Sequence, residues 1–308
     1  MAENEQLAKV IEFWRGTVAR EHLFERELAG RLDVDTKEVV DLAGVRRCGK
    51  SSILKLLIRR LGLVDKALYV NFEDPYFAEH NSASVIEDLL EVYTEFFYAG
   101  VKFLFFDEIQ EISGWEKAVR KLRDSGDYKL FVTGSSSKLL SGEFSTLLTG
   151  RHLSYYAFPL SFREFLAFNG VEAEDKRALA VKSTELLKNF RDFLQIGGFP
   201  EVVMTGNRVL LQQYFLDIIY KDIAGRHKVR QPEVLERLGV FLMSNSAKAI
   251  SPTGVSKAFG ISREFASLYL GYFKEAFLVF ELPKFSYSLK TQQKALKKYY
   301  SIDTGMAN

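Results

Sequence analysis

The sequence predicts an α/β protein, in which a parallel-sheet domain with a phosphate-binding loop is followed by an α-helical domain that ends in a winged helix. Short apolar runs alternate with helical patterns up to about residue 160, which is typical of a parallel sheet with helical crossovers. The glycine-rich, basic segment GVRRCGKSS (44–52) joins one such run to a helical pattern. After residue 160 the strand signal fades and helical spacing takes over.

The composition indicates a soluble globular protein. The chain has 308 residues, 47% hydrophobic and 27% charged, and by length it could form two domains. A single cysteine, Cys48, excludes an internal disulfide and suggests a reducing compartment. No apolar run approaches the roughly 20 residues of a membrane span, and the N-terminal MAENEQ lacks the basic start of a signal peptide. We therefore expect a cytoplasmic protein with no membrane partner.

The elements of the first domain follow in order along the chain. Residues 4–30 have the apolar spacing of one or two amphipathic helices. Strands are then predicted at 38–43, 67–74, 102–108 and 128–136, with a further apolar stretch at 153–160, and helices at 51–61, 83–97 and 115–124. Right-handed crossovers would place these helices on the faces of one parallel sheet.

The segment 44–52 matches the phosphate-loop (Walker A) pattern G-x-x-x-x-G-K-[ST]. It lies between an apolar strand and an amphipathic helix, which is the context that the pattern requires. Backbone N–H groups at such a turn favour phosphate, and glycine lets the backbone approach it closely. A basic turn that caps a helix is the alternative. We expect the nucleotide-binding set to be Gly44, Val45, Arg46, Arg47, Cys48, Gly49, Lys50, Ser51 and Ser52.

A pair of carboxylates ends the predicted strand KFLFFDE, in the manner of a Walker B motif. Open α/β sheets bind ligands at the carboxyl ends of their strands, so Asp107 and Glu108 should face the phosphate loop. Ser51 and Asp107 would hold Mg²⁺, and Glu108 would orient or deprotonate the attacking water. Gln110 could also touch that water. The alternative, a solvated acidic strand end, is disfavoured by the upstream phosphate loop.

Three further residues are candidates for the same site. The next strand ends in VTGSSS, so Thr133 and Ser135 would lie beside the carboxylates if the two strands are neighbours. Their hydroxyls could bind the γ-phosphate or the water, or could simply belong to a Gly-Ser turn. Arg151 could reach a phosphate in its own or a neighbouring subunit, because arginine binds phosphate in a bidentate manner, or it could form a structural salt bridge.

The second half is predicted to be helical, with a winged helix at its end. Helices are expected at 161–169, 175–195, 208–224, 232–245, 251–259 and 262–275, and hairpin strands at 278–288 and 297–303. The turn near residue 260 has helix-turn-helix spacing, and the stretch between Leu282 and Ile302 has five lysines and no acidic residue. A lid or domain-packing role is the alternative to DNA binding. The candidate DNA-contacting residues are Ser262, Arg263, Ser267, Lys290, Lys294, Lys297 and Lys298.

The motifs together resemble those of the AAA-type P-loop ATPases of archaea and bacteria, which are grouped near the STAND class of NTPase switches. The resemblance spans nearly all of residues 35–308 and rests on GVRRCGKSS, FFDEIQEISGWEKAVRKL, FVTGSSSKLL, GRHLSYYAFPLSFREFL, GGFPEVV and YFLDIIYKDI. It implies ATP or ADP binding, Mg²⁺, an ASCE-type catalytic glutamate at Glu108 and a C-terminal winged-helix region. Many relatives continue into a domain resembling a PD-(D/E)XK nuclease, so this chain is expected to be a short or truncated member.

The sequence therefore predicts an ATPase domain over residues 1–160, with N-terminal helices in 1–35, then a helical lid or linker over 161–230 and a winged-helix domain over 231–308. We expect catalysis by Lys50, Glu108, Thr133, Ser135 and Arg151. ATP hydrolysis would drive a conformational switch that recruits a protein partner or a second copy of the chain. The alternative is a DNA-stimulated ATPase or remodeller that holds duplex DNA.

Overall fold

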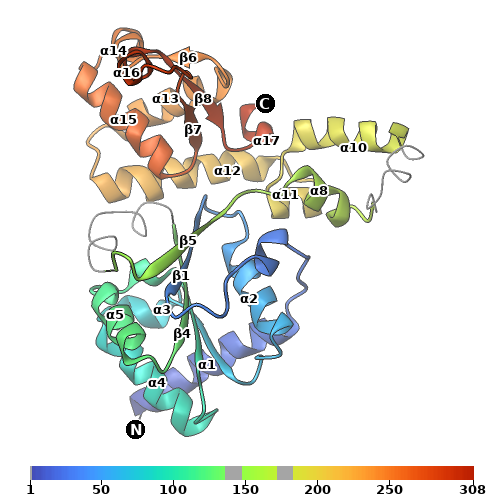
Figure 1. Ribbon diagram of the computed structural model, residues 1–308, viewed down its shortest axis with the longest axis vertical. Helices are drawn as coiled ribbons and strands as arrows, with labels where there is room; N and C mark the ends of the chain where they lie inside the picture. The colour runs from blue at the N-terminus through green and yellow to red at the C-terminus, as the bar shows by residue number, and fades with distance from the viewer. Residues whose placement is uncertain (1, 136–147, 172–182) are drawn as a thin grey trace. The chain divides into compact units, whose positions relative to one another are not determined.

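The computed structural model describes residues 2–135, 148–171 and 183–308, and it divides into two compact units (Figure 1). The first unit comprises residues 1–44 and 49–157. The second comprises residues 158–308 together with the loop residues 45–48. The first unit thus ends three residues before the expected boundary at 160. Each unit is described by itself below.

The first unit contains a five-stranded parallel sheet in the order β2-β3-β4-β1-β5. Its strands are β1 (Val39–Gly44), β2 (Ala67–Asn71), β3 (Phe103–Asp107), β4 (Lys129–Ser135) and β5 (His152–Ala157). All six residues of β1 are buried, as expected for a central parallel strand covered on both faces. The α/β fold class is therefore confirmed. Because β4 lies between β1 and β3, it separates the strand before the phosphate loop from the strand that ends in the carboxylates.

Helices surround this sheet (Figure 1). They are α1 (Ala2–Arg20), η1 (Glu27–Gly30), α2 (Lys50–Arg60), α3 (Pro75–Glu79), α4 (Ser84–Phe96), η2 (Ile109–Glu111) and α5 (Trp115–Ser125). The short helix α3 was not predicted, because five residues are too few for an apolar period. Its start is nevertheless encoded locally: Asp74 accepts a hydrogen bond from the Tyr76 N–H, and Pro75 occupies the first turn.

The second unit begins with helices. They are α8 (Phe162–Phe168), α10 (Ser183–Ile196), α11 (Pro200–Thr205), α12 (Val209–Asp217), the π-helix η3 (Ile218–Gly225), α13 (Pro232–Ser244) and the C-terminal α17 (Thr304–Ala307). The capping box of α8 is complete, since Ser161 and Glu164 each bond the other's backbone N–H. The first part of the helix expected at 175–195 lies outside the described residues.

The end of the second unit combines two helices with a three-stranded antiparallel sheet in the order β6-β8-β7. The elements are β6 (Ala249–Ile250), α14 (Pro252–Phe259), α15 (Arg263–Glu275), β7 (Val279–Leu282), α16 (Leu289–Lys294) and β8 (Lys297–Ser301). The strand predicted over 278–288 stops at Leu282, because Pro283 cannot donate a ladder hydrogen bond. Across residues 2–135, 148–171 and 183–308, no helix combines the length and the apolar character needed to cross a bilayer.

Candidate functional site

The phosphate loop connects β1 to α2, and its two motif glycines have distinct structural roles. A Cβ at Gly44 would collide with the carbonyl oxygen of Ala157 on the neighbouring strand, so only glycine fits there. Gly49 caps α2 with a φ of 95°, in the left-handed region that favours glycine. The first backbone N–H groups of α2 are therefore directed into the loop, where an anion would be stabilised.

Lys50 is the first residue of α2, and its side chain is only 4% exposed. Its Nζ donates to the Gly44 carbonyl oxygen at 3.3 Å and lies 3.6 Å from Oε1 of Glu108. A buried ammonium between two oxygen acceptors is held in place before any ligand arrives. The arrangement therefore brings the Walker A lysine and the predicted catalytic glutamate into one site.

Asp107 ends β3 and is fully buried. Its Oδ2 accepts hydrogen bonds from the Tyr69 hydroxyl at 2.8 Å and from Asn71 Nδ2 at 3.3 Å, while Thr133 donates to Oδ1. Ser51 also bonds to this carboxylate. Both Tyr69 and Asn71 were missed by sequence reasoning, because they lie on β2 and only the β2–β3 register brings them opposite the end of β3.

The donor set fits a hard divalent cation. Burial raises the pKa of the Asp107 carboxyl above its ordinary value, and the neighbouring Glu108 charge raises it further. A cation at this carboxylate would offset the cost of keeping the charge out of water. Oxygen ligands such as the Asp107 carboxylate and the Ser51 hydroxyl are those that Mg²⁺ prefers.

Glu108 follows directly in the left-handed backbone region, with φ 51° and ψ 44°. Its N–H donates to Thr133 Oγ1 at 3.0 Å, and Gln110 Nε2 donates to its Oε2 at 2.6 Å. One carboxylate oxygen thus faces Lys50 and the other is held by Gln110. A non-glycine residue in this conformation carries a backbone cost of about 1 kcal/mol or more, which is consistent with a position selected for its chemistry.

The structure brings together five of the predicted residues: Lys50, Ser51, Asp107, Glu108 and Thr133. Ser135 pairs with Gly44 in the register of β4 with β1, so its backbone lies next to the loop.

Arg151 lies elsewhere. It precedes β5 at the end where β1 begins, and its guanidinium is 3.7 Å from Asp124. The loop begins five residues further along β1, about 17 Å away at 3.3 Å per residue. The guanidinium therefore forms the structural salt bridge that was the alternative, and contact with a phosphate of the same chain stays a prediction that this position does not favour. A role in a neighbouring subunit stays a prediction.

The two loop arginines make side-chain contacts within the second unit. Arg46 forms a bidentate interaction with Asp222 of η3, with its Nε 3.1–3.2 Å from both carboxylate oxygens. The Arg47 guanidinium lies 6.0 Å from the centre of the Tyr214 ring. Asp222 was also missed, since nothing local in the sequence links a helix near residue 222 to the loop. The backbone N–H groups of the two arginines remain the predicted phosphate donors.

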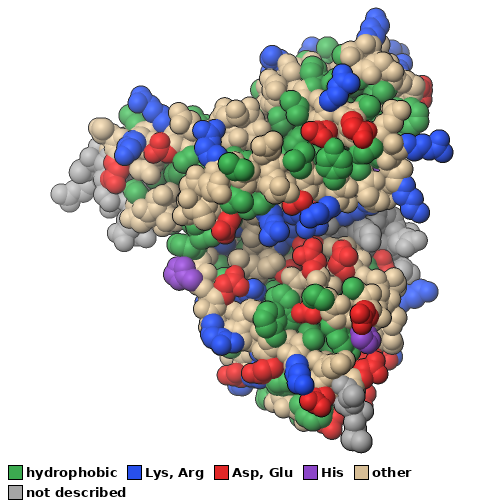
Figure 2. Space-filling model, turned by 180° about the vertical axis from the view of Figure 1, so that it is seen from behind, with side chains coloured by type: hydrophobic (Ala, Val, Ile, Leu, Met, Phe, Trp, Pro, Cys, Tyr) green, Lys and Arg blue, Asp and Glu red, His purple; other side chains and the backbone are tan. Residues whose placement is uncertain are grey.

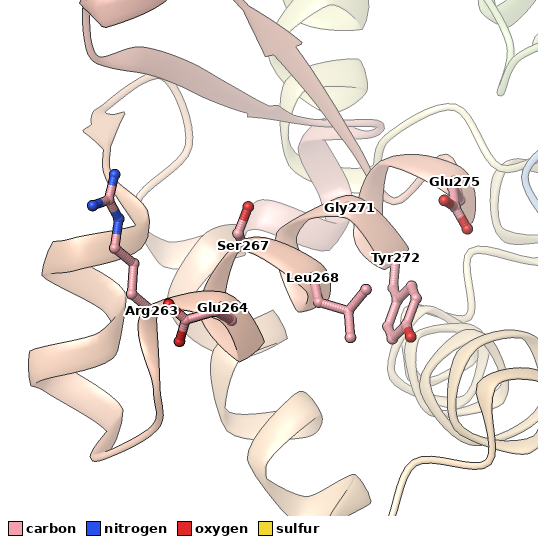
Figure 3. A pocket seen from close by; sticks show the side chains of 7 residues that line it. All are labelled: Arg263, Glu264, Ser267, Leu268, Gly271, Tyr272 and Glu275. Carbon is pink, nitrogen blue, oxygen red and sulfur yellow. The ribbon is translucent and has the colours of Figure 1, made fainter.

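The predicted DNA-contacting residues divide into two groups. Ser262, Arg263 and Ser267 are exposed on α15, and Ser262 caps that helix by accepting from the Phe265 N–H. A shallow groove along α15 also contains Glu264 and Glu275, with Leu268 and Tyr272 on one side of the helix (Figure 3). These carboxylates would oppose a phosphate backbone.

The lysines of the hairpin form the second group. Lys297 is 2.7 Å from Glu281, which it shares with Lys274. Lys290, Lys294 and Lys298 are exposed. Basic side chains project at the outer edge of the second unit in the region of α14 and α16 (Figures 1 and 2).

Comparison with known proteins gives two family matches. Residues 36–166 match a family described as AAA domain, and residues 187–308 match one described as Domain of unknown function (DUF8612). An uncharacterized protein of Methanocaldococcus jannaschii, MJ1544, is 38% identical over 274 residues, covering 86% of this chain and 60% of that protein. An uncharacterized protein of Haemophilus influenzae is 31% identical over 284 residues, covering 88% of this chain and 69% of that protein. The chain thus spans about two thirds of the length of these relatives.

Solved structures resemble the chain only distantly. The Aeropyrum pernix Orc1 protein in complex with DNA is 13% identical, with a TM-score of 0.37 over 99% of this chain and 90% of that one. The Pyrococcus horikoshii STAND protein PH0952, which has a tetratricopeptide repeat sensor, is 14% identical, with a TM-score of 0.36 over 94% of this chain and 42% of that one. Similarity this low carries no functional argument. The chain therefore belongs to one family with the Haemophilus influenzae relative, and its residues 36–166 match the AAA domain, in agreement with the site geometry.

Proposed function

We propose that the first unit binds Mg²⁺-ATP and hydrolyses it to ADP and phosphate. One observation carries this proposal: Lys50 of the phosphate loop contacts Glu108, and Glu108 directly follows the fully buried, hydrogen-bonded Asp107. Buried charges are costly unless they are paired or bind a ligand. Such a group of charges at the carboxyl end of a strand is therefore more typical of a binding site than of a purely structural position.

Each residue of the site has a role that follows from its position. The loop amides and the Lys50 ammonium would bind the β- and γ-phosphates and stabilise the charge that develops on them during transfer. Ser51 and Asp107 would hold Mg²⁺, which, when bound, neutralises phosphate charge. Glu108 would accept a hydrogen bond from the attacking water, oriented by the donor from Gln110. Thr133 positions both residues, because its hydroxyl donates to the Asp107 carboxylate and accepts from the Glu108 backbone N–H.

We further propose that hydrolysis drives a conformational switch in the second unit, whose C-terminal part would act as a winged helix. The contact that favours this is the ion pair between Arg46, a phosphate-loop residue, and Asp222 of a π-helix, since π-helical turns are frequent at functional sites. The second candidate is a DNA-stimulated ATPase, which the exposed lysines of the hairpin favour.

Steady-state ATP hydrolysis, with and without duplex DNA at low salt, tests these proposals. The wild-type chain should hydrolyse ATP, and Glu108→Gln should retain ATP binding while turnover falls about 100-fold or more. Unchanged turnover in Glu108→Gln would refute the assignment of the catalytic residue. Stimulation by duplex DNA would favour the second candidate, whereas slow turnover that is indifferent to DNA would favour the switch.

A further inference from the structure

The connection between β7 and β8 presents aromatic rings and lysines together on an exposed surface. We define the wing surface as Lys284, Phe285, Tyr287, Lys290, Lys294 and Lys298. We propose that the wing surface binds single-stranded nucleic acid, with bases stacked on Phe285 and Tyr287 and the backbone phosphates held by the lysines. This refines the partner suggested for the second unit and does not depend on ATP hydrolysis by the first.

The two rings are exposed to a degree that packing does not explain. Tyr287 is 98% exposed and Phe285 is 76% exposed. Their ring centres are 5.3 Å apart at an interplanar angle of 75°, so the two rings contact each other edge-to-face while both remain largely exposed. Exposed aromatic faces on a basic surface are the platforms on which unpaired bases stack.

The charge of the wing surface is of one sign. Between Leu282 and Ile302 the sequence has lysines but no acidic residue. Lys290 and Lys294 are four residues apart on α16, so they share one face of that helix about 5–6 Å apart. Within the described parts of the chain, neither of them forms an ion pair, whereas the nearby Lys297 is paired with Glu281. The lysines of the wing surface therefore remain available to a polyanion.

Two other classes of partner fit these observations less well. In a duplex the base faces are already stacked inside the helix, so the two rings would have nothing to bind. An interfacial lipid anchor is typically an amphipathic helix with one large apolar face, whereas Phe285 and Tyr287 lie outside the helices described and α16 has a single apolar residue, Leu289. The combination of open rings and lysines favours an unpaired strand.

The direct test is fluorescence anisotropy of the full chain, without nucleotide, on a labelled 20-residue oligo-dT and on a 20-base-pair duplex. We expect oligo-dT to bind at least about tenfold more tightly than the duplex. The double variant Phe285→Ala/Tyr287→Ala should weaken oligo-dT binding by about tenfold or more and leave duplex binding nearly unchanged. The exposed Phe96 of α4, 57% accessible, provides the matched control as Phe96→Ala.

The lysines are tested through salt dependence. Lys290→Gln/Lys294→Gln should reduce the slope of log affinity against log salt by about 1.4, because each phosphate contact on a single strand contributes about 0.7. Lys37→Gln/Lys66→Gln removes the same charge from exposed positions of the first unit and should leave the slope unchanged.

Four results would overturn the proposal: equal affinity for duplex and oligo-dT, insensitivity to loss of both rings, binding to anionic phospholipid vesicles without binding to oligo-dT, or binding to none of these probes. Because the assay omits ATP, a failure here is distinct from a failure of the proposed hydrolysis. A chain that binds oligo-dT but does not hydrolyse ATP would refute only the latter.

Discussion

Lys50 and Lys290 illustrate two opposite uses of the same residue type. Lys50 is 4% exposed and lies between the Gly44 carbonyl oxygen and the Glu108 carboxylate. Lys290 is exposed on a six-residue helix. A buried, hydrogen-bonded charge has one position, and moving it costs several kcal/mol. An exposed lysine keeps its rotamer freedom and acts through the sum of its field with that of its neighbours.

The difference indicates what each region can recognise. The phosphate site is preorganised by bonds among Lys50, Asp107, Glu108 and Thr133. It should therefore select ligands by their geometry, and a single substitution in it should change binding or turnover strongly. The wing surface should respond to the number of charges and to salt, with little dependence on any one lysine. The predictions below test this contrast.

The largest effect is expected at the centre of the buried site. Lys50→Ala removes the ammonium that faces the phosphates, so nucleotide affinity should fall at least about 100-fold and hydrolysis should be lost. Titration calorimetry with ATP and Mg²⁺ measures the affinity. The exposed Lys66→Ala should bind like the wild type. If Lys50→Ala still bound ATP tightly, the phosphate site would depend on a single lysine no more than the wing surface does.

A smaller effect is expected from Gln110, which positions Glu108 without touching phosphate. Gln110→Ala should lower kcat about tenfold with little change in KM, because it frees one carboxylate oxygen from its 2.6 Å donor. Gln6→Ala, at an exposed position of α1, is the control. A raised KM at unchanged kcat would show that Gln110 contributes to binding instead.

The contrast between buried and exposed pairs can be tested for stability within the second unit. Asp222 is 6% exposed and holds Arg46 through two oxygens, so Asp222→Ala should lower the free energy of unfolding by about 2 kcal/mol. The control is Lys221→Ala, since Lys221 is 64% exposed in its pair with Asp217 and its loss should cost about 0.5 kcal/mol. Urea denaturation measures both variants. If both variants lost the same free energy of unfolding, burial would not explain the strength of the Arg46–Asp222 pair.

The smallest effect concerns His152 of β5. Its Nδ1 lies 2.7 Å from Oδ1 of the buried Asp41, and this hydrogen bond raises the pKa of the imidazole. The stabilisation is complete below the unfolded value of about 6.5 and is lost as pH rises through the higher folded pKa.

Wild type should therefore lose about 0.5–1 kcal/mol of stability between pH 6 and pH 8.5 relative to His152→Gln. Urea midpoints at the two pH values measure it. The exposed His22, whose ring lies edge-on to Phe24, supplies the control as His22→Gln. If the wild type instead gained stability relative to His152→Gln as the pH rises from 6 to 8.5, the predicted direction of the pH dependence would be wrong.

Part of the fold and of the site followed from local pattern. The order of strands and helices in the first unit, the phosphate loop and the carboxylate pair all depend on residues close together in the chain, where periodicity, glycine and Pro signals operate. The main errors were also local in origin: α3 and α16 are too short to show a period, and the strand predicted to residue 288 was cut at Pro283.

The sequence by itself determined that a P-loop AAA-type domain would place Lys50, Asp107 and Glu108 together at the carboxyl ends of the strands. Ligands of a parallel sheet bind at these ends, and the loop that follows each strand identifies them in the sequence. Only the tertiary structure decided which residues support them. Tyr69 bonds Asp107 through the β2–β3 register, and Asp222 holds Arg46 across 176 positions of sequence.

The same rule applies to the charges outside the site. Register placed Arg151 at the far end of β1 and paired Lys297 with Glu281 of the antiparallel hairpin, so neither is available in the way its sequence context suggested. Secondary structure is encoded over a few residues, whereas a hydrogen bond or an ion pair between strands depends on pairing and register. Those are fixed only when the apolar faces of the whole sheet are buried together.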